Sequence, residues 1–356
     1  MTDAALRTLF VDAGYTFVEP PIVHPASVFV ELAGEDLRRR LFLTAVNGTE
    51  LALRPDYTIP VCLHHLATGA SQRRADYAYL GPVFRQRQDE PSEFVQAGIE
   101  SLGRRDRLKA DADVMGLALR ATEQRGIRHP IVRIGDAALF DALLKSLDLS
   151  RPWQTKLART FGESDRLKAM IAGATASKTK RRSESRLGRA AAKRRASDLL
   201  AAAGLAVIGG RDADEIATRY VEKTALAKGI DATSRRRLTE YLAIDGRPSE
   251  ALLTMRAFVR RNRLPMDTTL DAFEARLDAF RDRGIDVDRM TFAADFGRRL
   301  DYYTGFVFEM HRTRKRGEKP IVGGGRYDRL LAMIGDGKSV PAVGFAMWLD
   351  RFGVDR

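Results

Sequence analysis

The sequence contains a single cysteine, Cys62, among its 356 residues. A lone cysteine excludes a disulfide within the chain, and it excludes zinc sites built from several thiolates. Because Cys62 stands in an apolar context, we expect it in the protein core rather than as a nucleophile.

Long apolar runs are also missing from the sequence. No stretch approaches the roughly 20 apolar residues that a membrane-spanning helix needs, and the N-terminus lacks a signal-peptide pattern. We therefore expect a cytoplasmic protein with no membrane partner.

Positive charge is plentiful, but it is concentrated in one segment. The formal net charge is +13, and residues 178–195 hold nine basic residues and one acid, a net +8. No aromatic residues interleave with these basic residues to stack on bases. We interpret residues 178–195 as a solvated basic segment and do not expect a nucleic-acid partner, although an RNA-binding module remains an alternative.

The N-terminal part of the chain mixes helix and strand patterns. Residues 4–13 predict an amphipathic helix with a possible cap at Asp3. Residues 40–54 predict a β-hairpin, because Asn47 and Gly48 form the pair that a two-residue turn prefers. The hairpin indicates that the central sheet is at least partly antiparallel.

The segment after the hairpin carries polar residues just before a predicted helix. Asp56 and Thr58 lie where a carboxylate and a hydroxyl can face a ligand, and helix capping is an equally good explanation of Thr58. His64 and His65 are expected on the surface of this helix. Since no third ligand stands at a suitable spacing, we predict no metal site.

Two further strands are predicted at residues 76–87 and 92–103. In the second strand, Gln96, Gly98 and Glu100 share one face. Because an unpaired polar face is costly to bury, this face is either exposed to solvent or lines a site. The residues alone leave both possibilities open.

The remaining chain predicts helices and a closing strand. A helix is expected at residues 105–128, and Ala, Leu, Arg and Glu at helical spacing then predict a helical insertion at residues 150–275. Near the C-terminus, Tyr303 and Gly305 share one face of a predicted strand, where the glycine leaves room for a ligand to approach the backbone.

Five motifs in this order resemble the catalytic domain of the histidyl-tRNA synthetase family. They are LRPDYT (53–58), FRQR (84–87) with EFVQAGIE (93–100), RRLDYYTGFVFE (298–309), GGGRYD (323–328) and AVGFAMWLDRF (342–352). The resemblance implies an α+β fold with a class II synthetase-like antiparallel sheet flanked by helices. It covers residues 1–145 and 280–356, with the helical insertion between them, and it implies a homodimer.

The resemblance also assigns a histidine-binding site. The nine residues that match the family pattern are Asp56, Thr58, Arg85, Gln96, Glu100, Arg298, Tyr302, Tyr303 and Tyr327. The family pattern implies that Asp56, Thr58 and Gln96 bind the α-ammonium group of histidine. It implies further that Glu100 and Tyr303 bind the imidazole, that Tyr327 forms a wall, and that Arg298 binds the carboxylate.

The nucleotide half of the family site departs from the pattern. Arg87 stands where the synthetases carry an acid that holds adenine, and the shortened loop at residues 88–91 contributes two acids instead of arginines. Acids repel a triphosphate. Trp348 replaces a glycine that leaves room for the nucleotide, although Arg351 is kept, and no anticodon-binding domain is expected after Arg356.

With the amino-acid half kept and the ATP half damaged, the chain most resembles the regulatory subunits of ATP phosphoribosyltransferase. The resemblance implies a non-catalytic subunit, without a cofactor, that binds L-histidine as effector. It implies feedback inhibition of a short-form catalytic subunit, which such subunits also activate, in a hetero-octamer at the first step of histidine biosynthesis. The main alternative is a truncated, synthetase-like enzyme that activates histidine.

Overall fold

A computed structural model of the chain describes residues 3–69, 71–88, 90–175, 223–298, 302–315, 317–335 and 337–353. The predicted basic segment at residues 178–195 lies outside the described residues. So do Asp89 in the shortened loop and three residues of the RRLDYY motif, Arg299, Leu300 and Asp301.

The helices and strands follow one another along the chain as three stretches. The first holds α1 (Asp3–Asp12), β1 (Thr16–Phe17), β2 (Val23–Pro25), α2 (Ala26–Arg38), β3 (Leu43–Val46), β4 (Thr49–Leu53), α3 (Thr58–Ala67), β5 (Ala75–Phe84), β6 (Glu93–Leu102) and α4 (Arg107–Gln124). The second holds β7 (Ile131–Asp136), α5 (Ala137–Ser146), α6 (Arg151–Thr160), α7 (Ser164–Gly173), α10 (Ala232–Leu242), β8 (Asp245–Gly246), α11 (Pro248–Asn262) and α12 (Asp267–Asp282). The third holds η2 (Val287–Arg289), β9 (Thr291–Ala293), β10 (Phe306–His311), β11 (Val322–Arg326), α13 (Leu330–Ile334), β12 (Ala342–Trp348) and η3 (Leu349–Arg351).

A nine-stranded sheet forms the centre of the fold. Its strand order is β1-β5-β6-β12-β11-β10-β7-β9-β8. Only the β1–β5 and β7–β9 pairs are parallel, and the other neighbours are antiparallel. The predicted α+β class with a largely antiparallel sheet is therefore confirmed.

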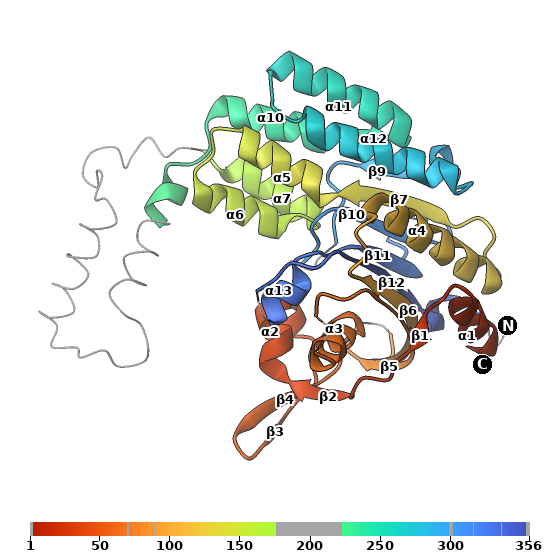
Figure 1. The fold of residues 1–356 in the computed structure, drawn as a ribbon. Helices are drawn as coiled ribbons and strands as arrows, with labels where there is room; N and C mark the ends of the chain where they lie inside the picture. The colour runs from red at the N-terminus through yellow and green to blue at the C-terminus, as the bar shows by residue number, and fades with distance from the viewer. Residues whose placement is uncertain are drawn as a thin grey trace, which may run out of the picture.

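The hairpin and the partly antiparallel central sheet are both confirmed, but the hairpin does not belong to that sheet. Asn47 and Gly48 adopt positive φ angles of 50° and 78° and join β3 to β4. Strand β4 also pairs with β2, so the three strands form a separate sheet, and Figure 1 shows the hairpin extending away from the main sheet. The central sheet owes its antiparallel character to β5, β6 and the C-terminal strands, because sheet membership depends on long-range pairing that a local turn does not specify.

Helices cover the sheet on both faces. On one face, α4 packs against β11 and β12, and α12 packs against α4. Ala97 and Ile99 of β6 point into this core, as their alternation predicts. On the other face, α2, α3 and α13 form a second core together with Tyr302 and Tyr327.

The predicted helical insertion is mostly helical where the structure describes it. Helices α6, α7, α10 and α11 fall within residues 150–275, and α10 to α12 lie at one end of the molecule in Figure 1. The two-residue strand β8 also falls in this range and pairs with β9 at the sheet edge. The division of the chain into two domains stays a prediction.

Several local predictions need correction. Asp3 lies inside α1 rather than before it. The side chain of Thr58 is not a cap, because α3 begins at Thr58 itself. His65 is not on the surface: it is buried, and its Nδ1 lies 3.1 Å from the hydroxyl of Tyr77. Cys62 is fully buried, as predicted.

Candidate functional site

All nine predicted site residues line one cavity, which we call the inner pocket. They are Asp56, Thr58, Arg85, Gln96, Glu100, Arg298, Tyr302, Tyr303 and Tyr327. The other lining residues are Gly323, Gly344, Phe345, Ala346 and Trp348, and the cavity volume is about 30 Å³. The fold thus brings together residues that lie up to 271 positions apart in the sequence, from Asp56 to Tyr327.

The polar face of β6 forms the floor of the inner pocket. Gln96 and Glu100 are each only 1% exposed, so this face is not solvent-exposed. Glu100 pairs across the ladder with Gly344 of β12. A Cβ atom at Gly344 would overlap the Glu100 carboxylate, so a glycine is required beside it.

Glu100 is held by phenol groups. The hydroxyl of Tyr327 donates to Glu100 Oε2, and the hydroxyl of Tyr79 lies 3.5 Å from Oε1. Burial raises the pKa of Glu100 to about 8, although hydrogen bonds from Tyr327 and Thr58 oppose the shift. The carboxyl group is therefore mostly protonated at neutral pH.

Two oxygen acceptors in the pocket lack partners. The backbone amides of Thr58 and Ile59 donate to Asp56, but its Oδ1 is buried with no hydrogen-bond partner among the described residues. Gln96 Oε1 is likewise buried and has no hydrogen-bond partner among the described residues. Burial raises the pKa of Asp56. Buried acceptors without partners are rare in folded proteins and indicate a place for a donor.

Two guanidinium groups supply donors without partners. Arg298 Nη1 donates to Glu309 Oε1 over 3.0 Å, whereas Arg298 Nε and Arg85 Nε are buried and have no acceptor among the described residues. Burial, followed by repulsion from Arg40, lowers the pKa of Arg85 to about 10. A Cβ atom at Gly323 would overlap the Arg298 guanidinium, so the glycine-rich strand β11 makes room for it.

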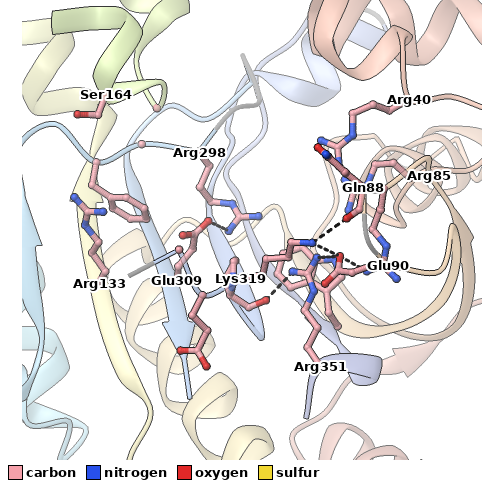
Figure 2. Close-up of a pocket in the computed structure, with 18 of the residues that line it drawn as sticks. Arg40, Arg85, Gln88, Glu90, Arg133, Ser164, Arg298, Glu309, Lys319 and Arg351 are labelled. Atoms are coloured by element: carbon pink, nitrogen blue, oxygen red, sulfur yellow. Dashed lines mark hydrogen bonds and ion pairs between the residues drawn. The ribbon is translucent and has the colours of Figure 1, made fainter. Parts of the chain in front are cut away.

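A larger cavity of about 980 Å³, which we call the outer cavity, adjoins the inner pocket. Arg85, Arg298 and Trp348 line both cavities and form the boundary between them. The indole ring of Trp348 lies between two guanidinium groups, 5.7 Å from that of Arg298 and 4.9 Å from that of Arg351. Figure 2 shows Arg85, Arg298 and Arg351 around the outer cavity.

The structure also identifies residues that sequence reasoning missed or misplaced. Tyr79 was not predicted to contact the site, although its alternation with Tyr77 on β5 was visible in the sequence. Gly305 lines neither cavity, and a Cβ atom there would lie 3.6 Å from the side chain of Arg326. The predicted role of Gly305 in ligand approach was therefore wrong.

Comparison with known proteins identifies relatives of the chain. The family described as histidyl-tRNA synthetase matches residues 2–207 and 211–352. ATP phosphoribosyltransferase regulatory subunits of Brucella canis and Brucella abortus are each 41% identical to the chain, over 94% of this chain and 91% of theirs. The chain belongs to this family of regulatory subunits.

Solved structures confirm the fold of this regulatory-subunit family. An ATP phosphoribosyltransferase regulatory subunit/histidyl-tRNA synthetase from Bacillus halodurans matches with a TM-score of 0.69 at 21% identity, over 98% of this chain and 77% of that one. Histidyl-tRNA synthetase from Nostoc matches with a TM-score of 0.65 at 20% identity, over 98% and 69%. The class II synthetase-like fold predicted from the motifs is therefore confirmed. In the part of the chain that the structure describes, no helix is long and apolar enough to cross a membrane.

Proposed function

We propose that the chain is a non-catalytic regulatory subunit of ATP phosphoribosyltransferase that binds histidine in the inner pocket. The observation that carries the proposal is the set of unpartnered polar atoms there. Acceptors on Asp56 and Gln96 and donors on Arg85 and Arg298 are buried together without partners among the described residues. Burying such groups is costly unless a ligand completes their hydrogen bonds.

The backbone of an amino acid fits these atoms. Its ammonium group donates to Asp56 Oδ1 and Gln96 Oε1, close to Thr58, and its carboxylate accepts from Arg298, with Arg85 beside it. Hydrogen bonds between charged groups are the stronger kind, and a guanidinium suits a carboxylate.

The remaining pocket residues suit an imidazole ring. Glu100 and the phenol of Tyr303 provide groups for its two nitrogens, and Tyr302 and Tyr327 provide aromatic walls. A protonated Glu100 donates to an imidazole nitrogen, whereas an ionised Glu100 pairs with an imidazolium. This side of the pocket therefore favours histidine over other amino acids.

The outer cavity argues against histidine activation by the chain itself. Arg87 forms ion pairs with Asp350 and Glu90, at 2.7 Å and 3.3 Å, and Trp348 occupies the boundary between the cavities. These contacts oppose ATP binding in the orientation that activation requires. We propose a cytoplasmic assembly in which a homodimer of this chain joins the short-form catalytic subunit in a hetero-octamer.

We propose that the small size of the inner pocket couples histidine binding to regulation of the catalytic partner. A volume of about 30 Å³ holds little more than one water molecule. Histidine therefore binds a conformation in which wall side chains have moved. Differential affinity for that conformation shifts the population of the complex towards an inactive catalytic partner.

Calorimetry of the full chain with histidine tests the proposal, using wild type and Asp56→Asn. The asparagine still accepts from the amides of Thr58 and Ile59, so the start of α3 is kept while the charge is lost. We expect histidine affinity to fall about 10- to 100-fold, and inhibition of the reconstituted complex to need correspondingly more histidine. Histamine and imidazolepropionate, which lack the carboxylate and the ammonium group, should both bind more weakly than histidine.

Asp141→Asn is the matched control, since Asp141 is an exposed residue of α5 that pairs with Lys145. Its affinity for histidine should equal that of wild type. Unchanged inhibition in Asp56→Asn would exclude the inner pocket as the effector site. Histidine-dependent exchange of pyrophosphate into ATP would instead establish the synthetase-like enzyme.

A further inference from the structure

A short segment that ends at Arg298 packs against the helical insertion. This segment, residues 295–298, follows strand β9 and carries the guanidinium group that we propose binds the histidine carboxylate. The side chain of Arg298 is fixed by Glu309, to which its Nη1 donates over 3.0 Å. The backbone of Arg298 lies against a different element, residues 161–163 between α6 and α7, which we call the insertion turn.

The insertion turn and this segment touch along their backbones. A Cβ atom at Gly162 would lie 2.9 Å from both the carbonyl carbon and the carbonyl oxygen of Arg298. A Cβ atom at Gly297 would lie 2.7 Å from the ring of Phe161, which stacks on Phe140 of α5 with 4.7 Å between the ring centroids. Gly162 also has a φ angle of 99°, which a residue with a side chain rarely adopts. Glycine at both positions therefore permits the close approach that fixes the backbone of Arg298.

A largely buried carboxylate ties the same segment to α7. Asp295 Oδ2 accepts from Ser164 Oγ and from Lys168 Nζ, each over 2.6 Å, and Oδ1 accepts from Arg133 Nη2 over 3.3 Å. Ser164 and Lys168 lie one helical turn apart on one face of α7. The Asp295 side chain is only 12% exposed, so these bonds hold the segment more firmly than an exposed ion pair does. Ser164 and Arg133 lie to the left of Arg298 in Figure 2.

We propose that Gly162 and Ser164 are positioning residues for Arg298, which they hold where the histidine carboxylate binds. The inference rests on the proposed histidine site. Gly162 and Ser164 do not line the inner pocket, so the helical insertion contributes to histidine affinity without contacting histidine. Displacement of Arg298 weakens a charged hydrogen bond to the carboxylate, whereas the contacts of the ammonium group and the imidazole ring stay as they are.

Calorimetry of the full chain with two ligands tests the inference. Histidinol carries a hydroxymethyl group in place of the carboxylate of histidine and keeps the ammonium group and the imidazole ring. Gly162→Ala displaces the backbone of Arg298. We expect it to bind histidine at least about tenfold more weakly than wild type, and histidinol less than about threefold more weakly.

Ser164→Ala removes one hydrogen bond to Asp295 without changing any charge. We expect histidine affinity to fall about threefold and histidinol affinity to stay nearly unchanged, because Lys168 still holds Asp295. Ser164→Thr keeps the hydroxyl group and should restore most of the histidine affinity.

Gly126→Ala is the matched control. Gly126 has a similar φ angle of 90°, but beyond its chain neighbours no described residue lies within 4 Å of a Cβ atom placed there. The variant carries the same kind of backbone strain away from Arg298, so its affinity for both ligands should equal that of wild type.

If Gly162→Ala does not fold, the two Ser164 variants decide the question. Equal losses of histidine and histidinol affinity, or unchanged histidine affinity, would overturn the inference and leave the proposed histidine site standing. Failure of the wild-type chain to bind histidine would instead overturn the proposed function, and the inference with it.

Discussion

Two buried groups of charged side chains in this molecule differ in how completely they are paired. The first, which we call the ion network, joins α4, β7, α12 and β11 and comprises Asp111, Asp136, Arg276, Arg326 and Asp328. The second lies in the inner pocket and contains Asp56, Arg85 and Arg298. Both groups are nearly shielded from solvent, yet only the second leaves polar atoms without partners among the described residues.

The ion network is satisfied by the protein alone. Asp111 Oδ1 accepts from Arg326 at 2.7 Å and Oδ2 accepts from Arg276 at 2.8 Å, while Asp136 Oδ2 accepts from Arg276 at 2.6 Å. Asp328 accepts from Arg326 and from the backbone amide of Ala342. Such a network holds the helices to the sheet, and it fixes the chain on both sides of the pocket residue Tyr327.

The difference distinguishes charges that are paired within the protein from charges that we propose a ligand pairs with. Burial alone does not identify a binding site, since Asp111 is more buried than Asp56. What marks the inner pocket is that acceptors and donors lining one cavity keep atoms without partners among the described residues.

The largest expected effect comes from breaking the ion network. Asp111→Ala leaves Arg276 with Asp136 and Arg326 with Asp328. Both buried guanidinium groups nevertheless lose a hydrogen-bond acceptor, so we expect the free energy of unfolding to fall by about 3–5 kcal/mol. Urea unfolding at neutral pH measures this loss. Asp113→Ala, two residues further along α4, removes a half-exposed carboxylate that pairs with Arg104 and Arg283. It should cost less than about 1 kcal/mol, and similar losses in both variants would contradict the structural role.

An effect of comparable size, spread over several pH units, is expected from Glu100→Gln, which tests the inner pocket. The pKa of Glu100 is about 8 in the folded chain, against 4.5 for an unburied glutamate. Because the folded state holds the proton more tightly, stability falls as pH rises between these values, by up to about 1.4 kcal/mol per pH unit.

Glu100→Gln should remove this part of the pH dependence and make the chain more stable than wild type at pH 8. Urea unfolding of both proteins from pH 5 to pH 9 measures the difference. Parallel pH profiles for the two proteins would show that Glu100 is not protonated in the folded state.

The smallest effect is expected at an exposed ion pair. Its loss of stability is the reference against which the effects in the ion network and the inner pocket are compared. Arg256 of α11 bonds Asp271 and Glu274 of α12 at 2.7 Å and 2.6 Å. Since these groups are largely solvated, Arg256→Gln should change the free energy of unfolding by less than about 0.5 kcal/mol. A loss comparable to that of Asp111→Ala would mean that pairing, and not burial, sets the size of these effects.

Local pattern was enough to predict much of the secondary structure. The turn at Asn47 and Gly48, the strand pair β5 and β6, and the helices α4 and α12 follow from turn chemistry and from apolar spacing. Predictions failed where long-range packing decides. The hairpin belongs to a separate sheet. His65 is buried next to Tyr77 of β5, and the apolar spacing of the helix does not predict contact with a strand.

The nine candidate site residues were found through motifs, and none came from spacing alone. For Gln96 and Glu100, the alternation of β6 established a shared face but left solvent exposure open. Tertiary packing decided the question, because residues from distant segments, including Thr58, Tyr302 and Tyr327, surround Gln96 and Glu100 in the inner pocket and bury them.

The sequence by itself determined the fold class, the family and the identities of the pocket residues, because these depend on local pattern and on motif order. Only the tertiary structure decided which polar atoms have partners. Asp56 Oδ1 is unpartnered among the described residues and Asp111 is fully paired, although both are buried aspartates. Glu90 meets Lys319 and Arg351 across more than 200 residues of chain. Whether two polar atoms pair depends on how close the fold brings them, and a local stretch of sequence does not show which distant residues will be close.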